Sequence, residues 1–557
     1  MKKRSYCFAA LLTAAALLAG CTPADPSASA PADSASAAQA SSPGETQAEA
    51  GEIQEETGEK VVVGAISSPW TNLYPYEISG TYDEIMNILI FDRLMDVSMD
   101  GDLIPREATD VTASEDGKTL TVSLSQDAHW HDGEPVTADD VVWSLQISCN
   151  PELSVSRRYL MNILDGTDDE GAQLSDGSVG VSKIDDYTIE MKLKKPMDPV
   201  TVFNTLKQFV VLPKHLLEDI PLSEMHTNDF WRSPIGSGPF MYDREITGER
   251  IELVKNEGYE YGPIDIDRLI LRVVPAANMV SGLISGEIDM NMGSIGPIQP
   301  VDYATLLEND NLNVESVPCF DFQYMAINDE REYLTDDIKR AMNMAIDKQL
   351  IVDQLLYGQG TVMYSVWPES HPYYADLDWD TYNPEEAKKI VEESGWDTDR
   401  ELLMLVPTGN TVREQSSAII QQNLADVGIK VRIQTSDFAT VMSECFEGNM
   451  DLALLGSAGT VEPHEVSTQF APGTTTCFSN LQTSEYYDLF QEALEYTSYE
   501  ERYPIYKKFQ ELFKEHTPYV TLYSPNMIEA YSKRLSNLDT RDFCQTNFAV
   551  WNWKVEE

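Results

Sequence analysis

The chain has 557 residues, more than one hydrophobic core usually supports, so we expect two or three domains. It carries 39 basic and 92 acidic residues, and the formal net charge is -53. This charge excludes a basic footprint for nucleic acid and disfavours direct binding to anionic lipid. It favours a soluble, self-repelling protein with neutral or cationic ligands.

The N-terminus is predicted to be a targeting segment. Lys2, Lys3 and Arg4 precede an apolar run that is too short to span a membrane. The pentad that ends this run, Leu-Leu-Ala-Gly-Cys21, resembles the lipobox of bacterial lipoproteins. That resemblance implies removal of residues 1–20 and diacylation of Cys21, whereas a plain secretory signal is the alternative. Residues 21–60 are small and polar, and we expect a disordered tether.

Five cysteines remain after cleavage and lipidation. Their spacing fits neither a zinc knuckle nor a CxxC redox pair, so we expect isolated, mostly buried thiols. An extracytoplasmic location also permits one disulfide among them. These cysteines are Cys149, Cys319, Cys445, Cys477 and Cys544.

The folded body is predicted to begin near Val61 with a buried strand and then a helix over residues 82–94. Asp-Gly pairs at residues 100–101 and 116–117 indicate hairpins, and residues 120–124 alternate as a strand should. We therefore expect a β-rich region before residue 125.

The next stretch, HWHDGEPVTADDVVWS at residues 129–144, allows two interpretations. His129, His131 and nearby carboxylates could bind a metal, but neither a third histidine nor an HExxH helix accompanies them. In the alternative, Asp-Gly forms a turn, Pro135 ends strand pairing, and Thr137 with Asp140 forms a capping box. We favour this second interpretation, in which the residues are structural.

The same region resembles a known family. The runs DGKTLTVSL at residues 116–124 and AHWHDGEPVTADDV at residues 128–141 are similar to the signature of the extracellular solute-binding proteins of family 5. These proteins are oligopeptide, dipeptide and nickel receptors of ABC importers. The resemblance continues through VVLPKHLL (210–217), GSGPF (236–240), SGEIDM (285–290), RAMNMAIDK (340–348) and YNPEEAK (382–388).

Residues beyond 400 alternate as strand, helix, strand, helix, strand, which predicts an α/β region with a parallel sheet. Ligands of such sheets collect beyond the carboxyl ends of strands, so we expect a ligand loop at residues 456–463. Its small residues should let another backbone approach, as peptide capture by strand addition needs. The loop residues expected to bind ligand are Gly456, Ser457, Ala458, Gly459 and Thr460.

The resemblance adds detail about that loop. Oligopeptide-binding members carry there an aspartate that binds the peptide α-ammonium, whereas this chain has Gly459 or Thr460. A blocked peptide, a neutral oligosaccharide or a nickel complex therefore remain alternatives to a free peptide. The resemblance also implies that further residues line the cleft, namely Ser79, Gly80, Thr81, Tyr82, Tyr159, Met292, Gly293 and Ser294.

The implied fold is α/β and resembles periplasmic binding proteins, with two lobes, a hinge and the extra small domain of the large type II, cluster C form. Lobe I would hold residues 61–103, 233–320 and 524–557, the small domain residues 104–232, and lobe II residues 321–523. Hinge crossings are expected near residues 316–328 and 519–526. The implied function is a monomeric, lipid-anchored receptor on the extracytoplasmic face that delivers ligand to an ABC permease, without a cofactor.

Two other functions stay open at this stage. An extracellular metallohydrolase would use His129 and His131, although neither a GxSxG elbow nor a Ser/His/Asp arrangement is visible. An adhesive surface lipoprotein would bind no small molecule. We favour the receptor, which is not an enzyme.

Overall fold

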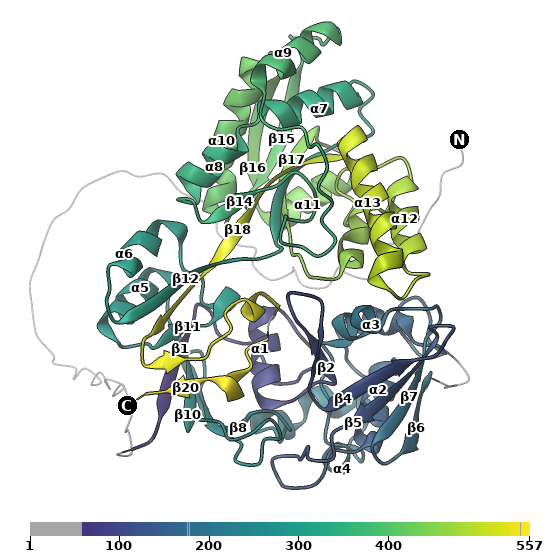
Figure 1. Cartoon of the computed structure of the whole chain (residues 1–557), viewed down its shortest axis with the longest axis vertical. Coiled ribbons are helices and arrows are strands. Elements are labelled where there is room, and N and C mark those ends of the chain that lie inside the picture. The colour runs from purple at the N-terminus through teal and green to yellow at the C-terminus, as the bar shows by residue number, and fades with distance from the viewer. Residues whose placement is uncertain (1–57, 175–176, 178, 546, 557) are drawn as a thin grey trace, which may run out of the picture. The chain divides into compact units, whose positions relative to one another are not determined.

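The computed structural model describes residues 58–174, 177, 179–545 and 547–556, and Figure 1 shows their arrangement. Within these ranges, no helix is both long enough and apolar enough to cross a membrane. The predicted signal peptide, Cys21 and nearly all of the tether lie outside the described residues.

A sheet of twelve strands is the largest in the described part of the chain, and it has two halves. In the first, which we call the β1 half, β1 pairs in parallel with β10 and β11. Antiparallel pairing then extends this half through β9 to β8. Its strands are β1 (Val61–Ile66), β8 (Phe240–Ile246), β9 (Arg250–Lys255), β10 (Arg268–Val273), β11 (Met290–Asn291) and β12 (Leu312–Pro318).

The second half, which we call the β13 half, confirms the predicted alternation. β15 pairs in parallel with both β16 and β17, whereas β13 runs antiparallel to β17. The strands of this half are β13 (Phe322–Ile327), β14 (Gly360–Val362), β15 (Glu401–Pro407), β16 (Lys430–Ser436) and β17 (Leu452–Ser457).

Helices cover both faces of the β13 half (Figure 1). β13 sends Met325 and Ile327 into a core shared with α7 to α10, and Tyr324 and Ala326 into a core shared with α11 to α13. This alternation follows from the period of two in a strand. The helices are α7 (Asp336–Ala345), α8 (Lys348–Leu355), α9 (Pro384–Glu393), α10 (Thr411–Asp426), α11 (Phe438–Phe446), α12 (Glu485–Ala493) and α13 (Tyr499–His516).

One long strand, β18 (Tyr519–Ser532), belongs to both halves. Its first residues, 519–523, pair with β13, and residues 526–532 pair with β12. The chain also crosses between the halves in the short link from β12 to β13. Both crossings lie where the hinge segments were predicted, and a hinge motion there remains a prediction.

A separate four-stranded sheet of order β4-β5-β7-β6 lies within the described part of residues 104–232. The Asp-Gly pair at residues 116–117 joins β4 to β5, and that at residues 100–101 joins β2 to β3, so both predicted hairpins are confirmed. These strands are β2 (Met95–Val97), β3 (Leu103–Pro105), β4 (Ala108–Ala113), β5 (Thr119–Leu124), β6 (Val181–Asp185) and β7 (Thr188–Lys192).

The remaining helices and strands lie mainly in the β1 half and in the small-sheet region. In the β1 half, α5 packs against β11, and α6 packs against β12. Near the C-terminus, β19 (Leu535–Ser536) pairs with β20 (Lys554–Val555). The other helices are α1 (Thr81–Ile90), α2 (Ala138–Ser148), α3 (Pro199–Leu206), α4 (Lys214–Leu217), α5 (Ala276–Ser285) and α6 (Tyr303–Leu307).

The stretch at residues 129–144 forms the predicted turn and capped helix. The Asp140 carboxylate accepts a hydrogen bond from the Thr137 N–H at 2.9 Å, which caps α2. The expectation that Pro135 ends the pairing is wrong, because Pro135 is bridged to His129, and hydrogen bonds continue on both sides. Pro135 is tolerated since its nitrogen occupies a position that donates no ladder bond.

His131 is engaged by the backbone of the glycine-rich run at residues 236–240. Its Nδ1 accepts the Gly236 N–H at 3.1 Å, and its Nε2 donates to the Gly238 carbonyl at 3.0 Å. Both ring nitrogens are therefore used structurally, which argues against a metal ligand. A Cβ at Gly236 would lie 2.0 Å from the Ile90 carbonyl oxygen, so glycine is required there by close packing.

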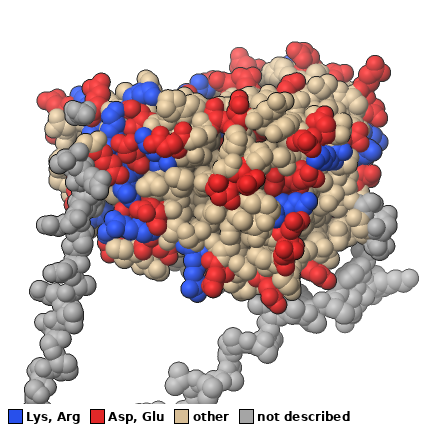
Figure 2. Space-filling model, turned by 90° about the horizontal axis from the view of Figure 1, so that it is seen from below, with Lys and Arg blue, Asp and Glu red and all other residues tan. Residues whose placement is uncertain are grey.

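The surface reflects the acidic composition. On the face shown in Figure 2, acidic side chains are widely spread, and basic side chains are interspersed among them. Such a face offers no extended basic stripe for a nucleic-acid backbone.

Candidate functional site

The predicted ligand loop begins on the last strand of the parallel set. Gly456 and Ser457 are the end of β17 and pair with Gln323 and Phe322 of β13. Residues 458–462 then leave the sheet at the carboxyl edge of β17. The amino end of β13 lies at the same edge because the two strands are antiparallel.

Other residues of the protein occupy the space beside the glycines of this loop. A Cβ at Gly459 would lie 2.1 Å from the Phe320 carbonyl oxygen, and one at Gly456 would lie 2.7 Å from the Arg413 guanidinium. Glycine is therefore required at position 459 by packing against the β12–β13 link, whereas the neighbours of Gly456 are the ends of the flexible Gln323 and Arg413 side chains. The approach of a ligand backbone to this loop remains a prediction.

Buried aromatic residues pack against the loop and support it. The His371 Nε2 donates to the Thr460 carbonyl at 3.0 Å, and the His371 ring lies 4.8 Å from that of Phe320. Because the ring is buried, the pKa of His371 falls to about 4, and the side chain is neutral.

Two charged residues at this edge were missed by the sequence interpretation. The Asp321 carboxylate accepts the Gly459 N–H at 2.9 Å. Arg413, in the first turn of α10, donates to Gln323 at 2.9 Å and has no carboxylate partner among the described residues. Burial raises the pKa of Asp321 and lowers that of Arg413. The rule that placed the loop after β17 applies equally to the segment after β15 and would have indicated Arg413.

The other expected residues lie in two connected segments of the β1 half. Ser79 and Gly80 immediately precede α1, which begins with Thr81 and Tyr82. Gly293 and Ser294 lie on a short 3-10 helix, η4 (Gly293–Ile295). Ser67 joins the segments, since its hydroxyl bonds to that of Tyr82 at 2.7 Å and its N–H donates to Ile295 at 2.7 Å. Met292 is fully buried against Gly64.

Tyr159 is exposed on another 3-10 helix, η1 (Arg158–Ile163). Its neighbour Arg157 lies 3.4 Å from Glu84 of α1. The described contacts do not join Tyr159 or the segments around Tyr82 and Met292 to residues 456–460. Their common role in binding remains a prediction.

A set of polar bonds joins α3 of the small-sheet region to the β13 half. The Thr201 hydroxyl donates to Glu462 at 2.6 Å and accepts from Arg502 at 3.0 Å, while Asn204 donates to Glu465 at 2.6 Å. Glu462 and Arg502 form a buried ion pair at 2.5 Å. Burial alone would raise the pKa of Glu462, but the charge of Arg502 outweighs it and lowers the pKa.

A comparison with protein-family models matches residues 102–476 to the bacterial extracellular solute-binding proteins, family 5. The chain belongs to this family. Its members are solute-binding proteins and not enzymes, and no group of three or more metal-ligating side chains is found in the described ranges.

Individual relatives agree with this assignment. The oligopeptide-binding protein AppA of Bacillus subtilis is 27% identical over 507 residues, covering 86% of this chain and 88% of that protein. The heme-binding protein A of Haemophilus influenzae is 25% identical, covering 80% and 83%. Among solved structures, the ABC transporter substrate-binding protein CtaP of Listeria monocytogenes superposes with a TM-score of 0.79 at 22% identity, covering 90% and 100%. The predicted periplasmic-binding-protein fold is confirmed.

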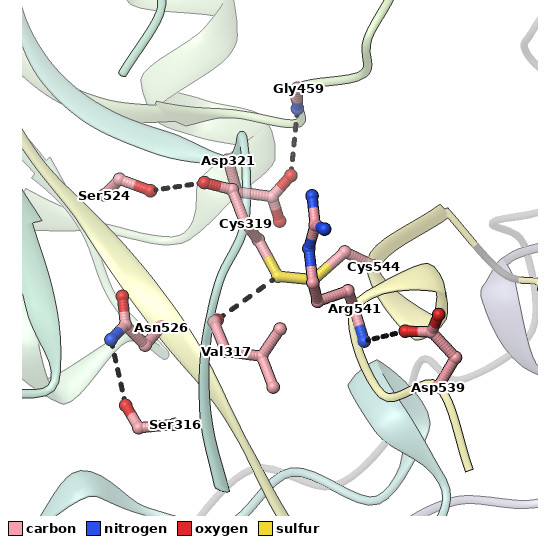
Figure 3. Close-up of a disulfide and its surroundings, with 10 residues drawn as sticks. All are labelled: Ser316, Val317, Cys319, Asp321, Gly459, Ser524, Asn526, Asp539, Arg541 and Cys544. Carbon is pink, nitrogen blue, oxygen red and sulfur yellow. Dashed lines mark hydrogen bonds between the residues drawn. A yellow bond between two sulfur atoms is a disulfide. The ribbon is translucent and has the colours of Figure 1, made fainter. Parts of the chain in front are cut away.

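A disulfide lies beside the predicted ligand loop of this family 5 protein (Figure 3). It joins Cys319, in the β12–β13 link, to Cys544 on the 3-10 helix η7 (Asp542–Gln545). The expectation of isolated thiols is wrong for these two cysteines, and the permitted single disulfide is present instead. Cys149, Cys445 and Cys477 are free and buried, as predicted.

Proposed function

We propose that the protein is a lipid-anchored, extracytoplasmic receptor of an ABC importer that captures peptides between two lobes. Family membership supports the receptor role. The oligopeptide-binding relative, matched over 86% of this chain, supports peptide as the ligand class. The anchor would be Cys21, so the protein meets the membrane only through its lipid and acts as a monomer that hands its ligand to a permease.

The observation that carries the proposal is the way the two halves of the sheet are joined. The β12–β13 link and β18 cross side by side, next to the ligand loop at the edge of β17. Rotation about these crossings would open and close the halves as lobes over a ligand. Lobe I and its small domain would be residues 61–320 and 524–557, and lobe II residues 321–523.

Peptide binding is tested by the thermal stability of the purified mature chain. A ligand that binds only the native state stabilises it, by about 2.7 kcal/mol at a hundred times its Kd. We expect short peptides to raise the Tm, and mass spectrometry of the untreated protein to detect co-purified peptide. If peptides leave the Tm unchanged while heme, a nickel complex or an oligosaccharide raises it, peptide is the wrong ligand class.

A further inference from the structure

Asp321 presents a carboxylate without a cationic partner beside the ligand loop. Its Oδ1 accepts the Gly459 N–H at 2.9 Å, its one hydrogen bond within the described residues. Among the described residues, no lysine, arginine or histidine side chain forms an ion pair with Asp321. Figure 3 draws the Arg541 side chain on the same side of the disulfide as Asp321, but Arg541 forms an ion pair with Asp100, at 3.0 Å.

The surroundings of Asp321 combine exposure with desolvation. The residue is exposed to solvent, yet the protein around it is dense enough to raise the pKa of the carboxyl group. By contrast, the pKa of the exposed Asp437 is lowered, because Thr440 donates two hydrogen bonds to its carboxylate. An exposed but desolvated carboxylate is accessible to a small cation and gains more from pairing than one on an open surface.

The two residues before Asp321 are held in place. Two residues earlier, Cys319 is held by its disulfide to Cys544, and its carbonyl accepts the Ser524 hydroxyl at 3.0 Å (Figure 3). Phe320 is buried between the His371 ring and Gly459. The carboxylate therefore needs little reorganisation to bind a ligand, which favours affinity.

We propose that Asp321 binds a primary ammonium group of the ligand, so that it selects peptides with a free N-terminus. The loop itself has no carboxylate between Gly456 and Val461, and Asp321 reaches the loop from the end of the β12–β13 link, next to β13. This inference rests on the proposed peptide receptor for its ligand class. The residue assignment extends to any ligand with a primary amine.

The test uses Asp321→Asn in the full mature chain. Asparagine keeps an oxygen that can accept the Gly459 N–H but removes the charge. The matched control is Asp399→Asn, which removes an exposed carboxylate before β15, at the opposite edge of the parallel strands. Binding is measured by calorimetry and thermal shift with two pentapeptide libraries, one with free and one with acetylated N-termini, and with spermidine and glucosamine as non-peptide amines.

We expect the wild type and Asp399→Asn to prefer the free library, and Asp321→Asn to bind it about 10- to 100-fold more weakly, with acetylated peptides unaffected. If the wild type and Asp321→Asn each bind the free and the acetylated library equally well, the inference is wrong, but the proposed function as a peptide receptor still holds. If only the non-peptide amines bind and Asp321→Asn weakens them, the inference holds and the peptide function fails. If no probe with an ammonium group binds the wild type more tightly than Asp321→Asn, the inference is wrong.

Discussion

His371 shows how one buried side chain supports the predicted ligand loop. Its Nδ1 accepts the Tyr373 N–H at 3.1 Å, and its Nε2 donates to Thr460, so the two bonds together require the neutral ring. The ring also stacks on Trp367 at 5.5 Å. Protonation would place a second donor against the Tyr373 N–H, inside an apolar environment.

This requirement predicts that His371 destabilises the fold in acid. The unfolded chain binds a proton at His371 below about pH 6.5, whereas the native pKa is about 4. The stability contributed by the neutral ring is complete above pH 6.5 and is lost as the pH falls towards 4. Between about pH 7 and pH 5 the loss is roughly 2 kcal/mol for this residue. Urea unfolding of the wild type and His371→Gln at both pH values measures it.

The free energy of unfolding should change less between the two pH values in His371→Gln than in the wild type, by that amount, although the variant is less stable at both. His226→Gln, which changes an exposed histidine, should keep the wild-type difference. A pH dependence that is the same in His371→Gln and the wild type would show that His371 takes up no proton on unfolding.

At the scale of elements, α3 holds the small-sheet region against the β13 half. The Thr201 hydroxyl makes two bonds across this contact, to Glu462 and Arg502, and both partners are buried. Loss of that hydroxyl removes about 1–2 kcal/mol of contact free energy. If the two halves move as the proposed lobes, weakening their contact by this amount favours the open form about 5- to 30-fold.

Thr201→Val should therefore increase the radius of gyration of the ligand-free protein, as measured by small-angle X-ray scattering. Thr205→Val is the control on the same helix, because among the described residues the Thr205 hydroxyl bonds only to the Thr201 carbonyl within α3, at 2.8 Å. If both variants scatter like the wild type, α3 does not hold the halves together.

Elements with local signals were predictable from the sequence, and pairings between distant segments were not. The capping box of α2 and the two Asp-Gly hairpins depend on neighbouring residues and are confirmed. The length of β18 is an example of such a pairing, because the strand runs through Pro525, which lies opposite Gly360 of β14.

The candidate site divides in the same way. Strand alternation was enough to place the loop at residues 456–460, because each βα unit is local in sequence. Asp321 was missed since it reaches Gly459 only through the antiparallel pairing of β13 with β17, which are more than a hundred residues apart. Sequence periodicity carries no information about such a partner.

For the whole molecule, the disulfide connects segments that the rest of the fold already holds together. The Thr540 hydroxyl, four residues before Cys544, donates to the Glu315 carboxylate of β12, four residues before Cys319, so the two segments are adjacent in the native state without the bond. In the unfolded chain, however, the bond joins cysteines 225 residues apart. Its main effect should therefore be to restrict the unfolded chain.

Replacing both cysteines, Cys319→Ser with Cys544→Ser, should lower the free energy of unfolding by about 2–5 kcal/mol. Guanidinium unfolding of the oxidised wild type, the reduced wild type and the double variant measures this loss. Reductant should bring the wild type close to the variant and leave the variant unchanged, because its remaining described cysteines are free thiols. Oxidised and reduced wild type that unfold at the same guanidinium concentration would contradict the prediction. That result would mean that native contacts hold these segments together even in the unfolded chain.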